Sequence, residues 1–211
     1  MSTQTINHGL GVTPEMIIAK ERGSGSGNGD WAVFHKDLTS GKYLVLNSSA
    51  GEASWSEALF SNINDTSVDV QNDSGSGIYL NDGMGPNTYI AYMFASVEGY
   101  SKVGSYTGNG SADGVFVYCG FRPAYIMVKR IDTTGENWGI LDAKRDTYNP
   151  TDEMLSADSS GSISETTLHN IDFCSNGFKI RNSHGTWNSP SGDVFIFYAV
   201  AESPFKYASA R

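Results

Sequence analysis

The fold is set by the stretch Thr13-Pro14-Glu15-Met16-Ile17-Ile18-Ala19-Lys20, which recurs later in the chain as Arg122-Pro123-Ala124-Tyr125-Ile126-Met127-Val128-Lys129. Each copy places a proline before a short run of large apolar residues and ends that run with a lysine. A run of this length is typical of a buried β-strand when turn-forming residues bound it. The two copies therefore predict two equivalent strands, within a repeat whose landmarks recur at an offset of roughly 107 residues that drifts slightly as loops change length.

Two further landmarks repeat in the same order. Asp30-Trp31-Ala32-Val33-Phe34 resembles Asn137-Trp138-Gly139-Ile140-Leu141, and Tyr89–Ala95 resembles Phe195–Ala201. A period of this length indicates a duplicated domain and not a solenoid unit. We therefore expect two domains, 1–100 and 101–211, and we expect Trp31 and Trp138 to occupy equivalent core positions.

Both copies consist of short apolar runs separated by clusters of Gly, Ser, Asn and Asp, which are turn signals. This pattern predicts an all-β fold of two tandem antiparallel β-sandwiches of the jelly-roll or lectin-like type. The alternative is one larger sandwich built from both copies. Brief helices are expected only at 56–61 and 152–157. The expected strands are 16–20, 31–34, 43–46, 67–70, 77–80, 89–95, 125–130, 138–141, 170–173, 177–181 and 194–201.

The two copies differ at their beginnings. Lys102–Gly110 precedes the second copy, whereas nothing precedes Ser2–Gly11 to match it. The first copy therefore begins one strand late, which predicts an unpaired sheet edge there and a chain that continues a longer protein. Because exposed edges invite pairing, we also expect a homo-oligomer.

Composition narrows the function classes. The 211 residues carry a formal net charge of −9, which disfavours contact with nucleic-acid phosphates and anionic membranes. There is no secretory signal pattern and no apolar run long enough to span a membrane. The two cysteines, Cys119 and Cys174, form neither a disulfide framework nor a CxxC metal motif, and we interpret both as packing residues.

Catalytic and metal motifs are weak. Glu52-Ala53-Ser54-Trp55-Ser56-Glu57 is the nearest approach to a glycosidase carboxylate pair, but Ser54 stands where a middle Asp is wanted. The histidines do not have metal-ligand spacing, and the Ser and Gly patterns contain neither a GxSxG elbow nor a phosphate loop. We expect no enzyme activity and no required cofactor. Calcium is the one cation considered, because oxygen-rich residues suit it: Asp65, Asp69, Asp73, Asn81 and Asp82.

Two tryptophans suggest a ligand site. Trp55 and Trp187 lie in polar, turn-rich segments and have no tryptophan counterpart in the other copy. An aromatic face in a polar loop can stack on a sugar, while neighbours such as His184 and Asn188 bond its hydroxyls. We expect Trp187, His184, Asn188 and Trp55 to bind a ligand. The alternative is that each tryptophan folds back over a small core.

Several stretches carry a resemblance to a known family. Thr5–Ile18, Lys102–Ser111, Gly120–Pro123, Asp172–Lys179 and the ending Ala201–Arg211 resemble tail-fibre-like virion proteins of marine bacteriophages. Those proteins resemble concanavalin-A-like, lectin-type β-sandwiches in repeated modules. The chain shows no anchor or long stem of the kind that attaches a fibre to a tail, so a head or baseplate decoration stays open.

The resemblance implies a non-enzymatic virion module, made in the cytoplasm of the bacterial host and carried on a phage tail or surface appendage. It also implies a homotrimer, contacts with other tail proteins and attachment to a host glycan or receptor. A neutral glycan or a protein receptor is expected, because the acidic chain would repel an anionic polymer. Two alternatives stay open: a purely structural decoration or spacer, and a polysaccharide depolymerase.

Overall fold

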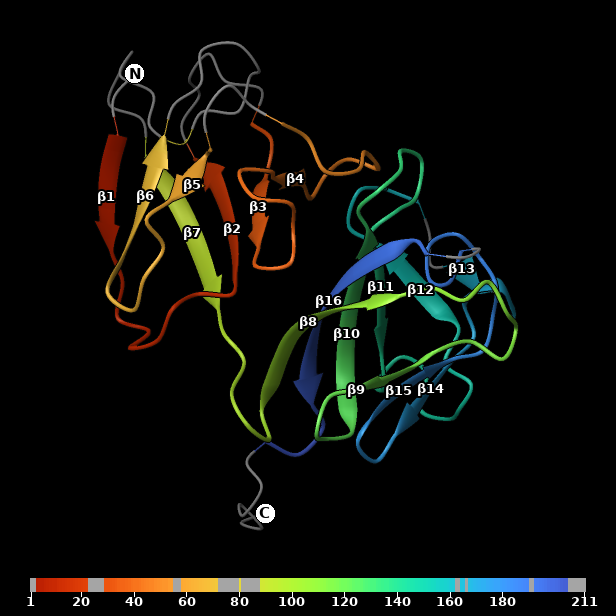
Figure 1. Cartoon of the computed structure of the whole chain (residues 1–211). Coiled ribbons are helices and arrows are strands. Elements are labelled where there is room, and N and C mark those ends of the chain that lie inside the picture. The colour runs from red at the N-terminus through yellow and green to blue at the C-terminus, as the bar shows by residue number, and fades with distance from the viewer. Residues whose placement is uncertain are drawn as a thin grey trace. The chain divides into compact units, whose positions relative to one another are not determined.

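The computed structural model describes residues 3–22, 29–54, 58–71, 80, 88–161, 164–165, 167–189 and 192–204. The chain divides into two compact units, Met1–Ala95 (unit 1) and Ser96–Arg211 (unit 2), each with its own sheets (Figure 1). The described residues contain no α-helix, but one short 3-10 turn at Thr167–His169. The predicted all-β sandwich class is confirmed. None of these elements is a helix that could cross a membrane.

Unit 1 packs a four-stranded sheet and a three-stranded sheet around one core. The larger sheet has the order β4-β3-β2-β7, and the smaller one has the order β1-β6-β5. Apolar side chains alternate inward along the strands, as Val68 and Val70 do. The strands are β1 Thr3–Asn7, β2 Met16–Glu21, β3 Ala32–His35, β4 Leu44–Val45, β5 Phe60–Ser61, β6 Ser67–Gln71 and β7 Tyr89–Phe94.

Unit 2 has the same arrangement of two sheets, but its main sheet contains more strands. Its six strands have the order β13-β12-β11-β10-β16-β8, and a second sheet has the order β14-β15-β9. A large aromatic and aliphatic cluster that includes Phe173, Phe178 and Phe195 is buried in this unit. The strands are β8 Ser101–Thr107, β9 Phe116–Tyr118, β10 Pro123–Arg130, β11 Gly139–Asp142, β12 Glu153–Ser156, β13 Ser164–Glu165, β14 Ile171–Cys174, β15 Gly177–Ile180 and β16 Val194–Ala201.

The sequence repeat is also a repeat of strand register. Ile17 lies opposite Phe34 on one side and Met93 on the other. Its counterpart Ile126 lies opposite Leu141 and Ala199, which are the residues that align with Phe34 and Met93. Because a shift of one residue would turn every side chain to the opposite face, matched registers give both units the same inward-facing positions.

A lysine contact is repeated too. Lys20 donates from Nζ to the carbonyl oxygen of Gly29, and Lys129 donates to the carbonyl oxygen of Glu136 at 2.8 Å. Each acceptor lies two residues before a tryptophan of the repeat. Trp138 is fully buried, as expected, whereas Trp31 is half-buried with the Lys20 ammonium 5.2 Å from its ring centroid. The expectation of a core position therefore holds for one of the two rings.

The units differ at one sheet edge. In unit 2, β16 lies between β10 and β8, whereas its counterpart β7 pairs with β2 and, within the described part of unit 1, with no second strand. The predicted open edge is therefore present in the described residues.

The prediction of brief helices at 56–61 and 152–157 is wrong for the described residues, which leave out residues 56 and 57. Residues 153–156 form β12, which pairs with β11, and Phe60–Ser61 forms β5, which pairs with β6. In β12, Met154 is buried between two exposed or half-buried neighbours, which is strand periodicity. The strand expected at 77–80 falls largely outside the described residues.

Candidate functional site

Trp187 lies in the core of unit 2. Its side chain has no exposed surface and belongs to the cluster that includes Phe178 and Phe195. A Cβ atom added to Gly139 would lie 2.6 Å from the indole ring, so β11 must carry glycine there to admit it. The expectation of an exposed, sugar-stacking face at Trp187 is wrong, because the polar loop 182–189 folds the ring inward.

His184 supports that loop. Its Nδ1 accepts a hydrogen bond from the backbone N–H of Thr186 at 3.3 Å, and its ring meets the ring of His169 edge-on at 5.3 Å. His169 is buried, and its Nδ1 accepts the indole N–H of Trp187 at 3.0 Å. Burial, with a smaller effect of nearby His184, lowers the pKa of His169 to about 4. These histidines therefore fix Trp187 in place.

Asn188 is also structural. Its side chain is fully buried, and Oδ1 accepts from the backbone N–H groups of Asn109 at 2.8 Å and Gly110 at 3.2 Å. Nδ2 lies within hydrogen-bonding distance of oxygens of Asn109, Ser111 and Asn182. Its polar atoms are occupied by the surrounding loops, so the expected ligand role does not fit Asn188.

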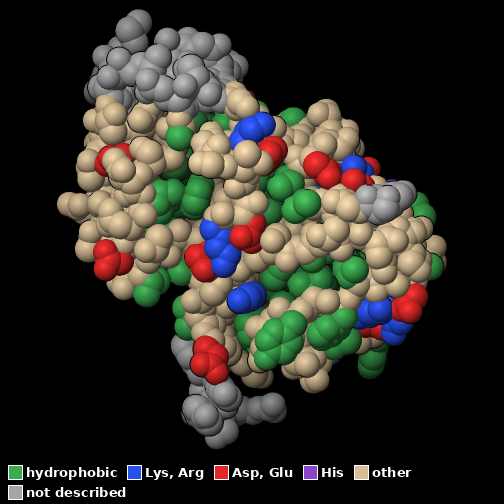
Figure 2. Space-filling model, viewed as in Figure 1, with side chains coloured by type: hydrophobic (Ala, Val, Ile, Leu, Met, Phe, Trp, Pro, Cys, Tyr) green, Lys and Arg blue, Asp and Glu red, His purple; other side chains and the backbone are tan. Residues whose placement is uncertain are grey.

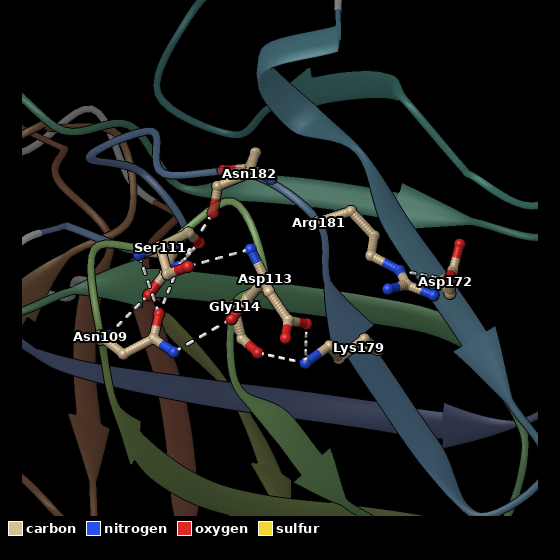
Figure 3. A network of polar contacts seen from close by, with 9 residues as sticks. Asn109, Ser111, Asp113, Gly114, Asp172, Lys179, Arg181 and Asn182 are labelled. Atoms are coloured by element: carbon tan, nitrogen blue, oxygen red, sulfur yellow. Dashed lines mark hydrogen bonds and ion pairs between the residues drawn. The ribbon is translucent and has the colours of Figure 1, made fainter.

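Two ion pairs hold the outside of this network. Lys179 lies 2.8 Å from the carboxylate of Asp113, and Arg181 lies 2.6 Å from that of Asp172 (Figure 3). Lys179 also donates to the carbonyl oxygen of Gly114. The pairs tie the loop after β8 and the strand β14 to β15. Exposed pairs of this kind contribute little stability, so we assign them a positioning role.

The remaining predicted residues form no assembled site within the part of the chain that the structure describes. Trp55 lies outside the described residues, as do Glu57, Asp73, Asn81 and Asp82. Glu52 accepts hydrogen bonds from the backbone and hydroxyl of Thr39, at 3.0 and 2.6 Å. Asp69 accepts from Thr5 and Asn62. The part of the chain that the structure describes contains no cluster of three or more His, Cys, Asp or Glu residues suited to a metal ion.

Exposed aromatic side chains gather instead on β9. Phe116 and Tyr118 both point outward from the strand, at 45% and 65% exposure, while Val117 between them is buried. Figure 2 shows hydrophobic side chains gathered over the part of unit 2 where Figure 1 places β9. Isolated exposed apolar residues are common, but a strand that presents two aromatic rings to solvent forms a patch with potential for contact.

A groove of about 520 Å³ lies beside Tyr118 in unit 2. The Tyr118 ring lies against Gly120, whose φ of +84° is a conformation that favours glycine. Polar groups reach the same groove. Its lining is Ser96, Val97, Glu98, Gly99, Ser101, Lys102, Tyr118, Cys119, Gly120, Phe121 and Ser203.

The groove combines an aromatic wall with hydrogen-bonding groups of both kinds. Glu98 supplies an acceptor, Lys102 a donor, and the hydroxyl of the exposed Ser203 can act as either. Its volume is within the range of small-molecule sites. Burial raises the pKa of Cys119 to about 12, so this thiol is not a nucleophile near neutral pH. The arrangement can bind a polar ligand that has one apolar face.

The sequence held a signal for this groove that was missed. Phe116-Val117-Tyr118 places two aromatic residues on one face of a short strand and an apolar valine on the other, whereas a half-buried strand normally alternates apolar and polar residues. Apolar residues on the outer face of a strand indicate a surface that contacts another molecule.

Comparisons with known proteins identify a family. Searches of the curated proteins and of the solved structures returned no match. The family profile described as "Domain of unknown function (DUF7483)" matches residues 1–204, which include both units. The chain therefore belongs to the DUF7483 family.

Proposed function

We propose that this protein is a non-enzymatic module of a bacteriophage tail fibre or related virion appendage, and that it contacts the host surface through the Tyr118 groove. Support comes from the resemblance of Thr5–Ile18 and Lys102–Ser111 to tail-fibre-like proteins, and from the paired all-β units. The groove carries the proposal, because it combines an exposed aromatic ring with polar groups.

A sugar is the ligand class that this chemistry fits best. Tyr118 offers a ring face for the C–H side of a pyranose, and Glu98 and Lys102 can bond hydroxyls. A net charge of −9 favours a neutral glycan over an acidic one. Glycoside hydrolysis uses a carboxylate pair, and the lining includes one carboxylate, that of Glu98, so binding is favoured over cleavage.

Weak sugar binding at each single site is consistent with a virion protein that presents several copies of the site. Sugar hydroxyls give up water for hydrogen bonds of similar strength, so each site gains little. Several copies on one particle raise the overall affinity. We therefore propose a homo-oligomer, with a trimer preferred, attached to other tail proteins. Light scattering that shows a monomer at high concentration would contradict this part.

A glycan array probed with the full chain tests the proposal. We expect binding to a neutral glycan, and we expect Tyr118→Ala to weaken it about ten-fold or more through loss of ring stacking. Tyr148→Ala is the matched control, because Tyr148 is 82% exposed and lies outside the groove. Equal binding by the two variants would reject this groove. Failure of the wild type to bind any glycan and to adsorb to bacterial cells would favour the structural-spacer alternative.

A further inference from the structure

Unit 1 differs from unit 2 at the outer edge of β7, which pairs with β2 and with no second strand among the described residues. The backbone N–H of Arg22 donates to the carbonyl of Thr88 at 2.7 Å, and hydrogen-bonding directions alternate along an antiparallel strand. The N–H and C=O groups of Ala91 and Met93 therefore point away from β2. Ala91 and Tyr92 are exposed. Their counterparts in unit 2 are less exposed, because Phe197 is buried and Tyr198 is half-buried.

In unit 2, strand β8 occupies the position that corresponds to the outer edge of β7. Phe197 and Ala199, the counterparts of Ala91 and Met93, lie opposite Gly104 and Lys102 of β8. The backbone hydrogen bonds between β16 and β8 continue beyond both ends of this pairing. The N–H of Ala201 donates to the carbonyl of Tyr100 at 2.8 Å, and the N–H of Gly108 donates to the carbonyl of Asp193 at 2.9 Å. The repeat therefore supplies a reference for both the direction and the register of a strand on β7.

A groove of about 370 Å³ lies next to the edge of β7 that no described strand of unit 1 covers. In unit 2 the corresponding inner position holds the ring of Tyr106, which stacks on Phe195 at 5.0 Å and meets Phe178 edge-on at 6.1 Å. Tyr89 stands where unit 2 has Phe195, so it provides a ring for the same contact. The groove is lined by Ile6, Asn7, His8, Gly9, Leu10, Tyr89, Ala91 and Met93.

The difference in size between Phe197 of unit 2 and Ala91 of unit 1 explains the groove beside β7. In unit 2 the Phe197 ring fills the region beside β8 so tightly that a Cβ on Gly104 would lie 3.0 Å from it. Unit 1 has the small Ala91 at that position. An incoming strand there can carry glycine or a somewhat larger residue opposite Ala91.

We propose that the β7 edge and its groove form a strand-acceptor site for an extended segment of the β8 type, donated by another polypeptide chain. The segment pairs antiparallel with β7, inserts an aromatic side chain opposite Tyr89 and places a small residue opposite Ala91. Main-chain bonds supply affinity and the aromatic pocket supplies selectivity, as in other cases of strand addition. This site belongs to unit 1 and is independent of the Tyr118 groove.

The probe is a synthetic peptide of residues 100–110, added to the full ¹⁵N-labelled chain. We expect saturable 1:1 binding, with amide shifts centred on Ala91 and Met93. A peptide carrying Tyr106→Ala should bind about ten-fold or more weakly, because it loses a buried aromatic ring. Ala91→Pro in the protein should abolish binding, because it removes an outward N–H that the peptide needs and that β2 does not use.

Ser105→Pro in the protein is the matched control. Ser105 is an exposed residue on the outer edge of β8, and proline there should leave peptide binding unchanged. Equal binding of the two peptides, unchanged binding by Ala91→Pro, shifts confined to unit 2 or no binding would each overturn the proposal. A concentration-dependent dimer that the peptide displaces would assign the edge to a second copy of this chain instead. If Ala91→Pro fails to fold, the Tyr106→Ala peptide and the shift map decide.

Discussion

The indole N–H of Trp187 donates to Nδ1 of His169 at 3.0 Å, and both side chains are buried. An indole N–H can only donate, so Nδ1 of His169 must be unprotonated for this bond to exist. The imidazole is therefore held neutral, with its proton on Nε2. This pair joins the turn Thr167–His169 to the loop that carries Trp187 and Asn188.

The first prediction concerns pH. The folded pKa of His169 is lowered to about 4 from an ordinary 6.5, so the unfolded chain binds the proton more tightly. The stability from this group is fully present above about pH 6.5 and is lost as the pH falls toward 4. We expect a loss of about 2 kcal/mol between pH 7 and pH 5. Urea unfolding at several pH values, followed by tryptophan fluorescence, measures it.

His169→Gln separates this effect from other titrations, because Gln can accept the indole bond without a proton change in this range. The variant should show a flatter dependence between pH 7 and pH 5. If the free energy of unfolding of the variant changed with pH as steeply as that of the wild type, a group other than His169 would cause the loss.

The second prediction concerns Asn188. Replacement by Ala leaves the backbone N–H groups of Asn109 and Gly110 and the carbonyl of Asn182 without this partner. We expect a loss of about 2–4 kcal/mol in the free energy of unfolding. Asn137→Ala, which removes one bond of 3.4 Å to Ser156, is the control and should cost less than about 1 kcal/mol. Similar costs for the two variants would contradict the structural role of Asn188.

The third prediction concerns Gly139. A methyl group at this position would lie 2.6 Å from the ring of Trp187, so Gly139→Ala should lower stability by about 1–3 kcal/mol through overpacking. Gly9→Ala meets no atom within 4 Å and should change stability by less than about 0.5 kcal/mol. Thermal unfolding by circular dichroism compares them. A Gly139→Ala protein as stable as the wild type would show that the ring has room to move.

The fourth prediction concerns thiol chemistry. Burial raises the pKa of Cys119 to about 12, whereas Cys174 is half-buried at the end of β14. At pH 8 a disulfide reagent should modify Cys174 first and Cys119 only on unfolding, because the thiolate is the reactive form. Cys174→Ser should remove the fast reaction. Two thiols that react at one rate in the native protein would contradict this prediction.

The duplicated strands could be predicted because their signal is local. The run Met16–Lys20 and its repeat carry their apolar pattern within a few residues, and strand formation follows it. The helix expected at 152–157 failed because pairing with β11 decides that segment, and such pairing between distant residues is not visible in local composition.

The ligand residues failed for a related reason. The polar neighbours of Trp187 suggested a solvated loop, but Asn188 accepts from the backbone of Asn109 and the hydroxyl of Thr186 donates to the carboxylate of Glu136, in a loop folded over the core. Buried loops need such partners, so polarity in sequence does not establish exposure. The groove at Tyr118 brings together residues from 96 to 203, and no single stretch contains it.

The pairing of β8 with β16 has a consequence for the way unit 2 can be handled. The first strand of the unit and the last one are neighbours, and Ala201 donates to the carbonyl of Tyr100 at 2.8 Å. The chain thus enters and leaves the folded unit at one point. Proteins with adjacent termini tolerate circular permutation and insertion, so unit 2 is suited to transplantation as a cassette into a surface loop of another protein.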